Sequence, residues 1–272
     1  MPDLTGRSYS SDTALTQVDE GVYEATIAPN WLVARGAHGG FLAGVTVAAM
    51  LAEAGDDRPI RSFTMHFMRP PTTGRIRIEP VVERSGRSAV FLSARATQND
   101  KAIGTALAAL SSSFADFPFD AAAPPSVPCP HEVEPAPPGI GPPFLDNFDL
   151  RWCVGDHMFS GSEKALVGGW FRADPPELAD AAMVASFMDT WPPAIFPLLT
   201  NEPLIAPTLD FTVHFRERFP LEGAAPEDFY LGAFSSSLSR DGFFEEDGRL
   251  WDGRGNLVAQ SRQLALLLKP GD

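Results

Sequence analysis

One five-residue pattern occurs twice in this chain, at the same place in two similar series of elements. Residues 63–67 read FTMHF, and 148 positions later residues 211–215 read FTVHF. Each copy follows a segment with helical character and precedes alternating segments that are typical of strands. Self-similarity at a fixed offset indicates a duplicated structural unit, so the chain is expected to contain two copies of one architecture.

The predicted elements follow the same order in both copies: two strands, a helix, the repeated pattern and then several longer strands. In the first copy we expect a helix over 38–55 and strands over 75–82, 89–97 and 103–110. In the second copy we expect a helix over 180–196 and strands over 229–237, 242–251 and 257–268.

The helix of the first copy, GGFLAGVTVAAML, is apolar nearly all round, which indicates a helix wrapped by other elements. The second repeated strand alternates instead. Its apolar face carries Leu209, Phe211, Val213 and Phe215, and its other face carries Thr208, Asp210, Thr212 and His214. We expect the first face to pack on a helix and the second to be available for chemistry. A single buried helix wrapped by an antiparallel sheet is the hot-dog architecture, so the predicted fold is α+β, a double hot-dog.

A proline-rich break separates the two copies. Ten of the 26 residues over 118–143 are proline, which excludes a central strand or a regular helix there. We therefore expect an N-terminal unit over 1–113, a linker over 114–147 and a C-terminal unit over 148–272.

Charge and composition exclude several classes of partner. The net charge of -14 argues against binding nucleic acid or an anionic membrane, because both are polyanions. Residues 58–101 nevertheless carry nine Lys and Arg against three acids. This local excess fits either a small phosphorylated ligand or arginines scattered on solvated strands. The first residues show no basic region followed by an apolar one, and no long apolar run occurs, so we expect a cytoplasmic protein. The spacing of Cys129 and Cys153 fits neither a disulfide framework nor a metal site.

At this point the sequence resembles the double hot-dog acyl-CoA thioesterases of the TesB type. The resemblance covers nearly the whole chain and is carried by HGGFLAG, HFMRPP, ERSGRS, PTLDFTVHF and LVAQSRQ. It implies hydrolysis of fatty acyl-CoA, with acyl-CoA as the binding partner and with neither metal nor other cofactor.

The same resemblance implies a catalytic set of Asp189 on the second helix, Thr208 before a Leu-Asp pair, and Gln263 in the last strand. Two features depart from the family pattern. Phe211 stands where the family usually has a histidine, and two prolines follow Asp189 closely. Gln260 remains a rival to Gln263, because alternation places the two glutamines on opposite faces of the strand.

These residue types suit thioester hydrolysis, which needs a held water, a base and donors for the developing oxyanion. Asp189, among apolar neighbours, is a candidate general base with a raised pKa. Thr208 and Gln263 could hold the water. His38, Gly39 and Gly40 are candidate substrate-binding residues at a helix N-terminus, although the glycines also fit close packing and His38 fits a capping or solvated position.

Two other functions stay open: an acyl-CoA binding protein without turnover, and a hot-dog enoyl-CoA hydratase or dehydratase. The hydratase pattern places a histidine beside the helix aspartate, and no histidine accompanies Asp189 in the sequence. The 148-residue offset from Asp189 falls on Phe41, so the first copy lacks a matching carboxylate. We also expect a homodimer, packed through a strand that carries Phe229, Leu231 and Phe234.

Overall fold

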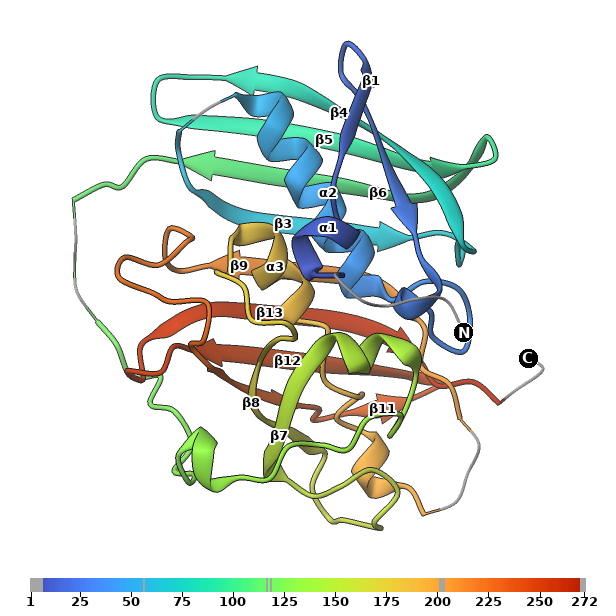
Figure 1. The fold of residues 1–272 in the computed structure, drawn as a ribbon, viewed down its shortest axis with the longest axis vertical. Helices are drawn as coiled ribbons and strands as arrows, with labels where there is room; N and C mark the ends of the chain where they lie inside the picture. The colour runs from blue at the N-terminus through green and yellow to red at the C-terminus, as the bar shows by residue number, and fades with distance from the viewer. Residues whose placement is uncertain (1–6, 56, 116, 118, 201–203, 270–272) are drawn as a thin grey trace.

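The computed structural model describes residues 7–55, 57–115, 117, 119–200 and 204–269. Pro118, where the proline-rich break was expected to start, lies outside these ranges. Within them, one antiparallel sheet of 13 strands runs through the molecule in the order β1-β2-β4-β5-β6-β3-β9-β13-β12-β10-β8-β7, with β11 paired to β12 (Figure 1). No helix in these ranges is both long enough and apolar enough to cross a membrane.

The first half of the sheet is built from the first six strands. They are β1 (Thr16–Asp19), β2 (Val22–Ile27), β3 (Ile60–Phe67), β4 (Gly74–Ser85), β5 (Ala89–Gln98) and β6 (Lys101–Ser111). The helices of this half are α1 (Tyr9–Asp12), the 3-10 turn η1 (Pro29–Trp31) and the long α2 (Gly39–Ala54).

The second half repeats this plan with seven strands. They are β7 (Phe148–Gly155), β8 (Leu166–Ala173), β9 (Thr208–Phe215), β10 (Tyr230–Ser235), β11 (Ser239–Arg240), β12 (Phe243–Trp251) and β13 (Leu257–Leu266). Its helix is α3 (Ala181–Phe187), and the 3-10 turns are η2 (Pro130–Glu132), η3 (Pro143–Asn147) and η4 (Phe196–Leu198).

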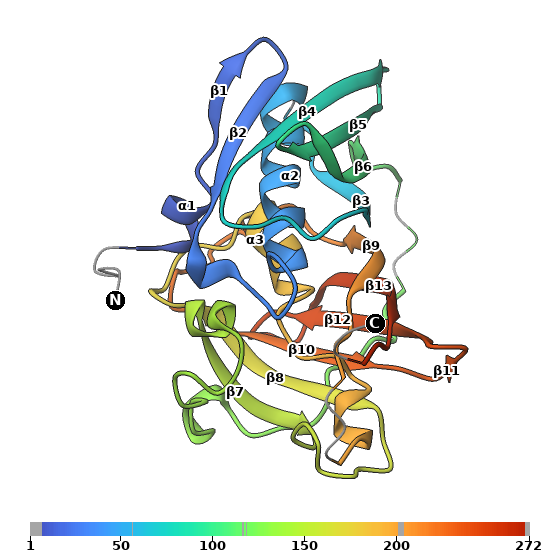
Figure 2. The same cartoon turned by 90° about the vertical axis from the view of Figure 1, so that its right-hand side faces the viewer.

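The repeated pattern forms the two central strands, β3 and β9, which pair with each other and join the halves into one sheet. Thr64 and Thr212, equivalent residues of the two copies, are opposite each other there, with their hydroxyl oxygens 2.9 Å apart. The sheet curves around α2 and α3 (Figures 1 and 2), and apolar residues of both halves share one core. The predicted α+β double hot-dog fold is confirmed.

The helix of the first copy agrees with its prediction, but the second helix is much shorter than predicted. His38 caps the N-terminus of α2, and Gly55 ends the helix in the left-handed conformation, with φ 53°. The second helix, expected over 180–196, ends at Phe187. Prolines at 192 and 193 lack the amide hydrogen that a continuing helix needs, and they disfavour helical backbone before them.

The proline-rich segment is more than a connection, because it packs on the outward face of the second half of the sheet. The indole nitrogen of Trp251 donates to the backbone oxygen of Ala122 (2.6 Å), and that of Trp170 donates to Pro128 (2.8 Å). Val127 packs into a small apolar cluster on this face. The division of the chain at 113 and 147 remains a proposal.

This cover overturns the predicted dimer surface. Phe229, Leu231 and Phe234 are all buried inside the chain. Leu231 lies in the cluster that the proline-rich segment covers, Phe234 belongs to the main core, and the guanidinium groups of Arg151 and Arg172 cover the ring of Phe229. The prediction failed because it placed Phe234 with Leu231, although the two lie on opposite faces of β10, and because the sequence does not show that the linker covers Leu231.

Candidate active site

Asp189 lies just beyond the C-terminus of α3, not on the helix as predicted. Its backbone N–H donates to the backbone oxygen of Ser186 (3.1 Å), which tightens the chain after the last helical turn. Its carboxyl group reaches the N-terminus of α2, where it accepts a hydrogen bond from the backbone N–H of Gly40. A helix N-terminus presents unpaired N–H groups and a partial positive charge, so it is a favourable place for a carboxylate.

The environment of Asp189 gives its carboxyl group an unusual pKa. Burial raises the pKa to about 7, against the opposing effect of the hydrogen bonds from Gly40 and Gln263. The side chain keeps 15% of its surface exposed, so it is accessible from solvent. A carboxyl group that titrates near neutrality can serve as a general base at physiological pH.

His38 lies beside Asp189, contrary to the expectation that no histidine accompanies this residue. Its Nδ1 accepts from the Phe41 N–H (3.3 Å), so Nε2 carries the proton and donates to the Asp189 backbone oxygen (2.7 Å). Nε2 also lies 3.4 Å from Asp189 Oδ2. Burial lowers the pKa of His38 to about 4. The ring is therefore a buried neutral cap that holds Asp189, with both nitrogens already engaged.

Gly39 and Gly40 let the backbone of α2 approach Asp189 closely. A Cβ atom at Gly39 would lie 2.7 Å from Asp189 Oδ2, and one at Gly40 would lie 2.7 Å from the Ser186 backbone oxygen. The hydroxyl of Ser186 donates to the Gly40 backbone oxygen (2.7 Å), which fastens the two helices together. The close-packing role expected for both glycines is confirmed, and a substrate-binding role stays a proposal.

Thr208 faces the inside of the sheet, whereas simple alternation predicted the outside. Gln263 on β13 is opposite Phe211, but Ala265, two residues along, is opposite Thr208. One extra residue, Leu209, is therefore accommodated in β9 as a bulge, and the bulge reverses the side on which Thr208 lies. The prediction that Thr208 lies on the face opposite Phe211 is therefore wrong.

Gln263 connects the candidate residues. Its Oε1 accepts a hydrogen bond from the Thr208 hydroxyl (2.8 Å), and its side chain also hydrogen-bonds the Asp189 carboxyl. Gln260 is opposite His214 and accepts from Arg216 Nε (2.8 Å) on the outward face. Gln263 is thus the glutamine that meets Asp189 and Thr208, as predicted.

Glu246 is a member of this network that the sequence analysis missed. It lies on β12 opposite Gln263, it is 3% exposed, and its Oε1 accepts from Gln263 Nε2 (2.7 Å). Its Oε2 accepts from the Ala194 N–H (2.6 Å), and burial raises its pKa to about 7. A signal was available, because alternation places Glu246 on the same face as Phe244 and so predicts a carboxylate among core positions.

The first copy carries an apolar counterpart of this network. At the helix crossing, Gly44 approaches the Ala182 oxygen and Gly40 approaches the Ser186 oxygen, so Gly40 corresponds to Ala182 and Gly44 to Ser186. The same offset relates Asp189 to Val47. The 148-residue offset between the repeated strands relates Asp189 to Phe41 instead. That offset does not apply to the helices, because the two helices are separated by a different number of residues than the two strands.

The strand pairings give the other three counterparts. Thr208, Gln263 and Glu246 correspond to Ile60, Ala108 and Leu92 through the matched registers of the two halves. The four residues of the first copy are all apolar and all at most 5% exposed. The duplicated fold therefore contains one polar network and one apolar, buried equivalent.

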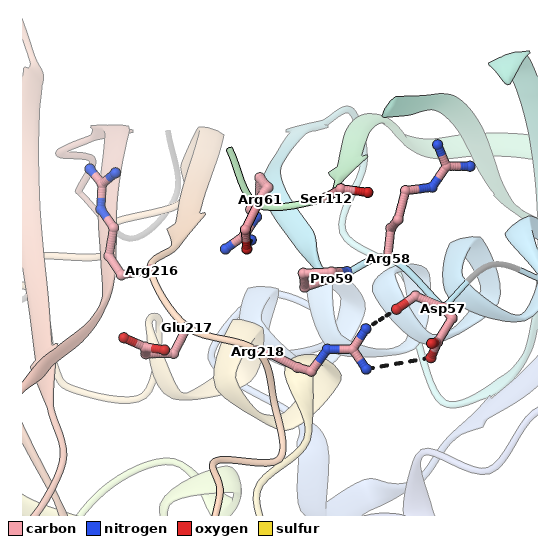
Figure 3. Close-up of a pocket in the computed structure, with 9 residues that line it drawn as sticks. Asp57, Arg58, Pro59, Arg61, Ser112, Arg216, Glu217 and Arg218 are labelled. Atoms are coloured by element: carbon pink, nitrogen blue, oxygen red, sulfur yellow. Dashed lines mark hydrogen bonds and ion pairs between the residues drawn. The ribbon is translucent and has the colours of Figure 1, made fainter. Parts of the chain in front are cut away.

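A basic hollow lies at the other end of α2. It is bordered by Arg58, Arg61, Arg216 and Arg218 together with acidic and small residues (Figure 3). Two of the arginines that border the hollow have partners: Arg218 forms an ion pair with Asp57, and Arg216 donates a hydrogen bond to Gln260. The hollow follows the C-terminus of α2, whereas Asp189 meets the N-terminus. In the described ranges no group of three or more His, Cys, Asp or Glu is placed to hold a metal ion.

Comparisons with known proteins point to one family. Residues 27–112 match the model of the acyl-CoA thioesterase N-terminal domain, and residues 119–267 match the model of the C-terminal domain. No curated protein matches the chain significantly in sequence.

Several solved structures are similar over almost their full length. A hot-dog protein of unknown function from Alicyclobacillus acidocaldarius has a TM-score of 0.84 and 24% identity, over 96% of this chain and 98% of that one. A putative thioesterase II from Thermobifida fusca has a TM-score of 0.82 and 27% identity, over 96% of this chain and 97% of that one. The tesB protein of Mycobacterium avium subs paratuberculosis has a TM-score of 0.78 and 20% identity, over 96% of this chain and 98% of that one.

Proposed function

Because the chain belongs to the acyl-CoA thioesterase family and is a thioester hydrolase, we propose that it hydrolyses fatty acyl-CoA with a water activated by Asp189, Thr208 and Gln263. The observation that supports this assignment most strongly is the hydrogen-bonded path from Asp189 through Gln263 to Thr208. It supplies a carboxylate with a near-neutral pKa beside a hydroxyl of fixed orientation.

The geometry suggests how these groups act. The Thr208 hydroxyl donates its proton to Gln263, so its oxygen keeps lone pairs that can accept from a water. A water held between Thr208 and ionised Asp189 would donate to both, and its own lone pair would then be directed at the thioester carbonyl. Asp189 takes the proton as the carbon–oxygen bond forms and gives it to the departing thiolate.

The N-terminus of α2 is the proposed site for the thioester oxygen. In this proposal the first-turn N–H group at Gly39 and the helix dipole stabilise the developing oxyanion, while the Gly40 N–H and His38 keep Asp189 in place. Gly39 has no side chain that would block this approach.

The test is release of free thiol by the purified protein from acyl-CoAs of graded chain length. Steady thiol release that Asp189→Asn abolishes would support the proposal. Binding of acyl-CoA without thiol release would favour the non-catalytic alternative, and hydration of an enoyl-CoA without thiol release would favour the hydratase.

Assembly and location complete the proposal. A homodimer remains our expectation, now through the outward face of the first half of the sheet. Val81, Phe91 and Leu107 are 53%, 45% and 63% exposed there, on neighbouring strands and on the same side. These three side chains stay exposed within the part of the chain that the structure describes. A role in lipid metabolism in the cytoplasm is likewise proposed, and cell fractionation tests the location.

A further inference from the structure

Glu246 is a buried carboxylate whose burial is unfavourable for folding, and its hydrogen bonds suggest a specific role. It is almost fully buried on the inward face of β12, and both of its oxygens accept hydrogen bonds, from Gln263 Nε2 and from the Ala194 N–H. Burying a carboxylate is unfavourable even when it is hydrogen-bonded. The first copy has Leu92 at the equivalent position, which shows that the fold itself does not require a carboxylate there.

The role of Glu246 is to orient the side-chain amide of Gln263. A side-chain amide can turn over and exchange its oxygen and nitrogen, and the two ends have opposite hydrogen-bonding character. Glu246, when ionised, accepts only, so it holds the nitrogen end of the amide toward itself. The oxygen end then faces Thr208 and receives its hydroxyl proton. With the amide turned over, Thr208 would face a donor and its hydroxyl proton would point elsewhere.

We infer that Glu246 is a positioning residue for thioester hydrolysis: it fixes the Gln263 amide, and through it directs the Thr208 hydroxyl so that its oxygen can accept from the attacking water. The inference rests on the proposed function. Glu246 does not touch the reacting atoms in this scheme, and it acts on them only through Gln263.

The titratable groups around Glu246 also predict an electrostatic effect. Asp189 and Asp247 act on it by charge, and His38 lies beside Asp189 as a neutral ring. Removing the charge of Glu246 leaves Asp189 with one fewer anionic neighbour, so Asp189 should ionise at lower pH.

The experiment compares kcat and its pH profile for the wild type, Glu246→Leu and Glu246→Gln. Glu245→Gln is the matched control, because Glu245 is the adjacent residue of β12 and accepts from the backbone N–H groups of Ser237 and Leu238 on the surface. For Glu246→Leu we expect kcat to fall about 10-fold or more in folded protein, from misorientation of the site. We expect its acidic limb to move to lower pH. The control should behave as wild type.

Gln263→Ala provides the second arm. In the Gln263→Ala variant, adding Glu246→Leu should lower kcat little further, because Glu246 acts through the Gln263 amide, which is no longer present. Full additivity, or wild-type kcat in folded Glu246→Leu, would overturn the inference. If Glu246→Leu does not fold, the isosteric Glu246→Gln decides: its amide can offer Gln263 either a donor or an acceptor, so wild-type kcat in folded Glu246→Gln overturns the inference. A wild type that releases no thiol overturns the proposed function itself, which is a distinct result.

Discussion

The carboxyl oxygen Oδ2 of Asp189 occupies the space that a side chain at Gly39 would need. A Cβ atom there would come within 2.7 Å of Oδ2. The absence of a side chain at one residue of α2 therefore sets how closely the carboxylate approaches the helix N-terminus.

From this contact we predict that Gly39→Ala lowers kcat about 10-fold to 100-fold, because the methyl group displaces Asp189 from its position. Steady-state kinetics on acyl-CoA measures the loss. Gly55→Ala, at the other end of α2, tests a general effect of the helix, since a Cβ there meets no atom within 4 Å although φ is positive. Equal losses in kcat for the two variants would contradict the assignment.

Asp189→Asn should fold normally and lose roughly 100-fold or more in turnover. The substitution keeps the volume and removes the charge that activates water. The measurement is kcat, with circular dichroism to verify the fold. Near wild-type turnover in folded protein would show that Asp189 is not the base.

Thr208→Val and Gln263→Ala should each cause a smaller loss, mainly in kcat, because Asp189 stays in place. Gln260→Ala is the control on the same strand, and it should leave kcat unchanged because Gln260 faces outward toward Arg216. A larger loss for Gln260→Ala than for Gln263→Ala would refute the roles given to the two glutamines.

Activity should rise with pH through neutrality, because the base must be ionised and burial places the pKa of Asp189 at about 7. The pH dependence of kcat/KM measures this. A profile that stays flat across neutrality would exclude Asp189 as the titrating group.

Folding stability should change in the opposite direction. The folded-state pKa values of Asp189 and Glu246 lie above their ordinary values of 3.8 and 4.5, so the folded protein binds more protons than the unfolded chain. Their effect on the free energy of unfolding therefore becomes less favourable as pH rises from about 4 to 7. Asp189→Asn should accordingly raise Tm above pH 7 relative to wild type, and thermal unfolding at two pH values checks this.

We predict that the protein is a dimer whose activity does not depend on association, because one chain already contains the whole network. Light scattering over a dilution series, run beside specific activity, tests both parts. Leu107→Lys should shift the equilibrium toward monomer without lowering kcat. Activity that falls in step with dissociation would mean that the site is shared between chains.

Much of the fold could be predicted because the duplicated pattern and the alternation of apolar residues are local signals. The extent of α2 and the repeated order of elements followed from them, whereas the pairing of the two central strands is known from the structure. The inward position of Thr208 could not be predicted, since the bulge at Leu209 is defined only by pairing with β13. Nor could the contact of His38 with Asp189, because it joins residues 151 positions apart.

The buried position of the dimer strand shows the same limit. The prediction grouped Leu231 with Phe234, which lie on opposite faces of β10, and the cover over Leu231 comes from Val127 in the proline-rich segment. Glu246 is different, because its inward place could have been derived from the sequence. Its partner Ala194, in the segment between α3 and β9, could not.

The apolar counterpart of the network predicts one site per chain. Val47, Ile60, Leu92 and Ala108 fill the place where a second network would lie, so active-site titration should count one equivalent per polypeptide despite the two copies. One half of the duplicated interior therefore serves packing alone at the positions where the other half carries polar groups.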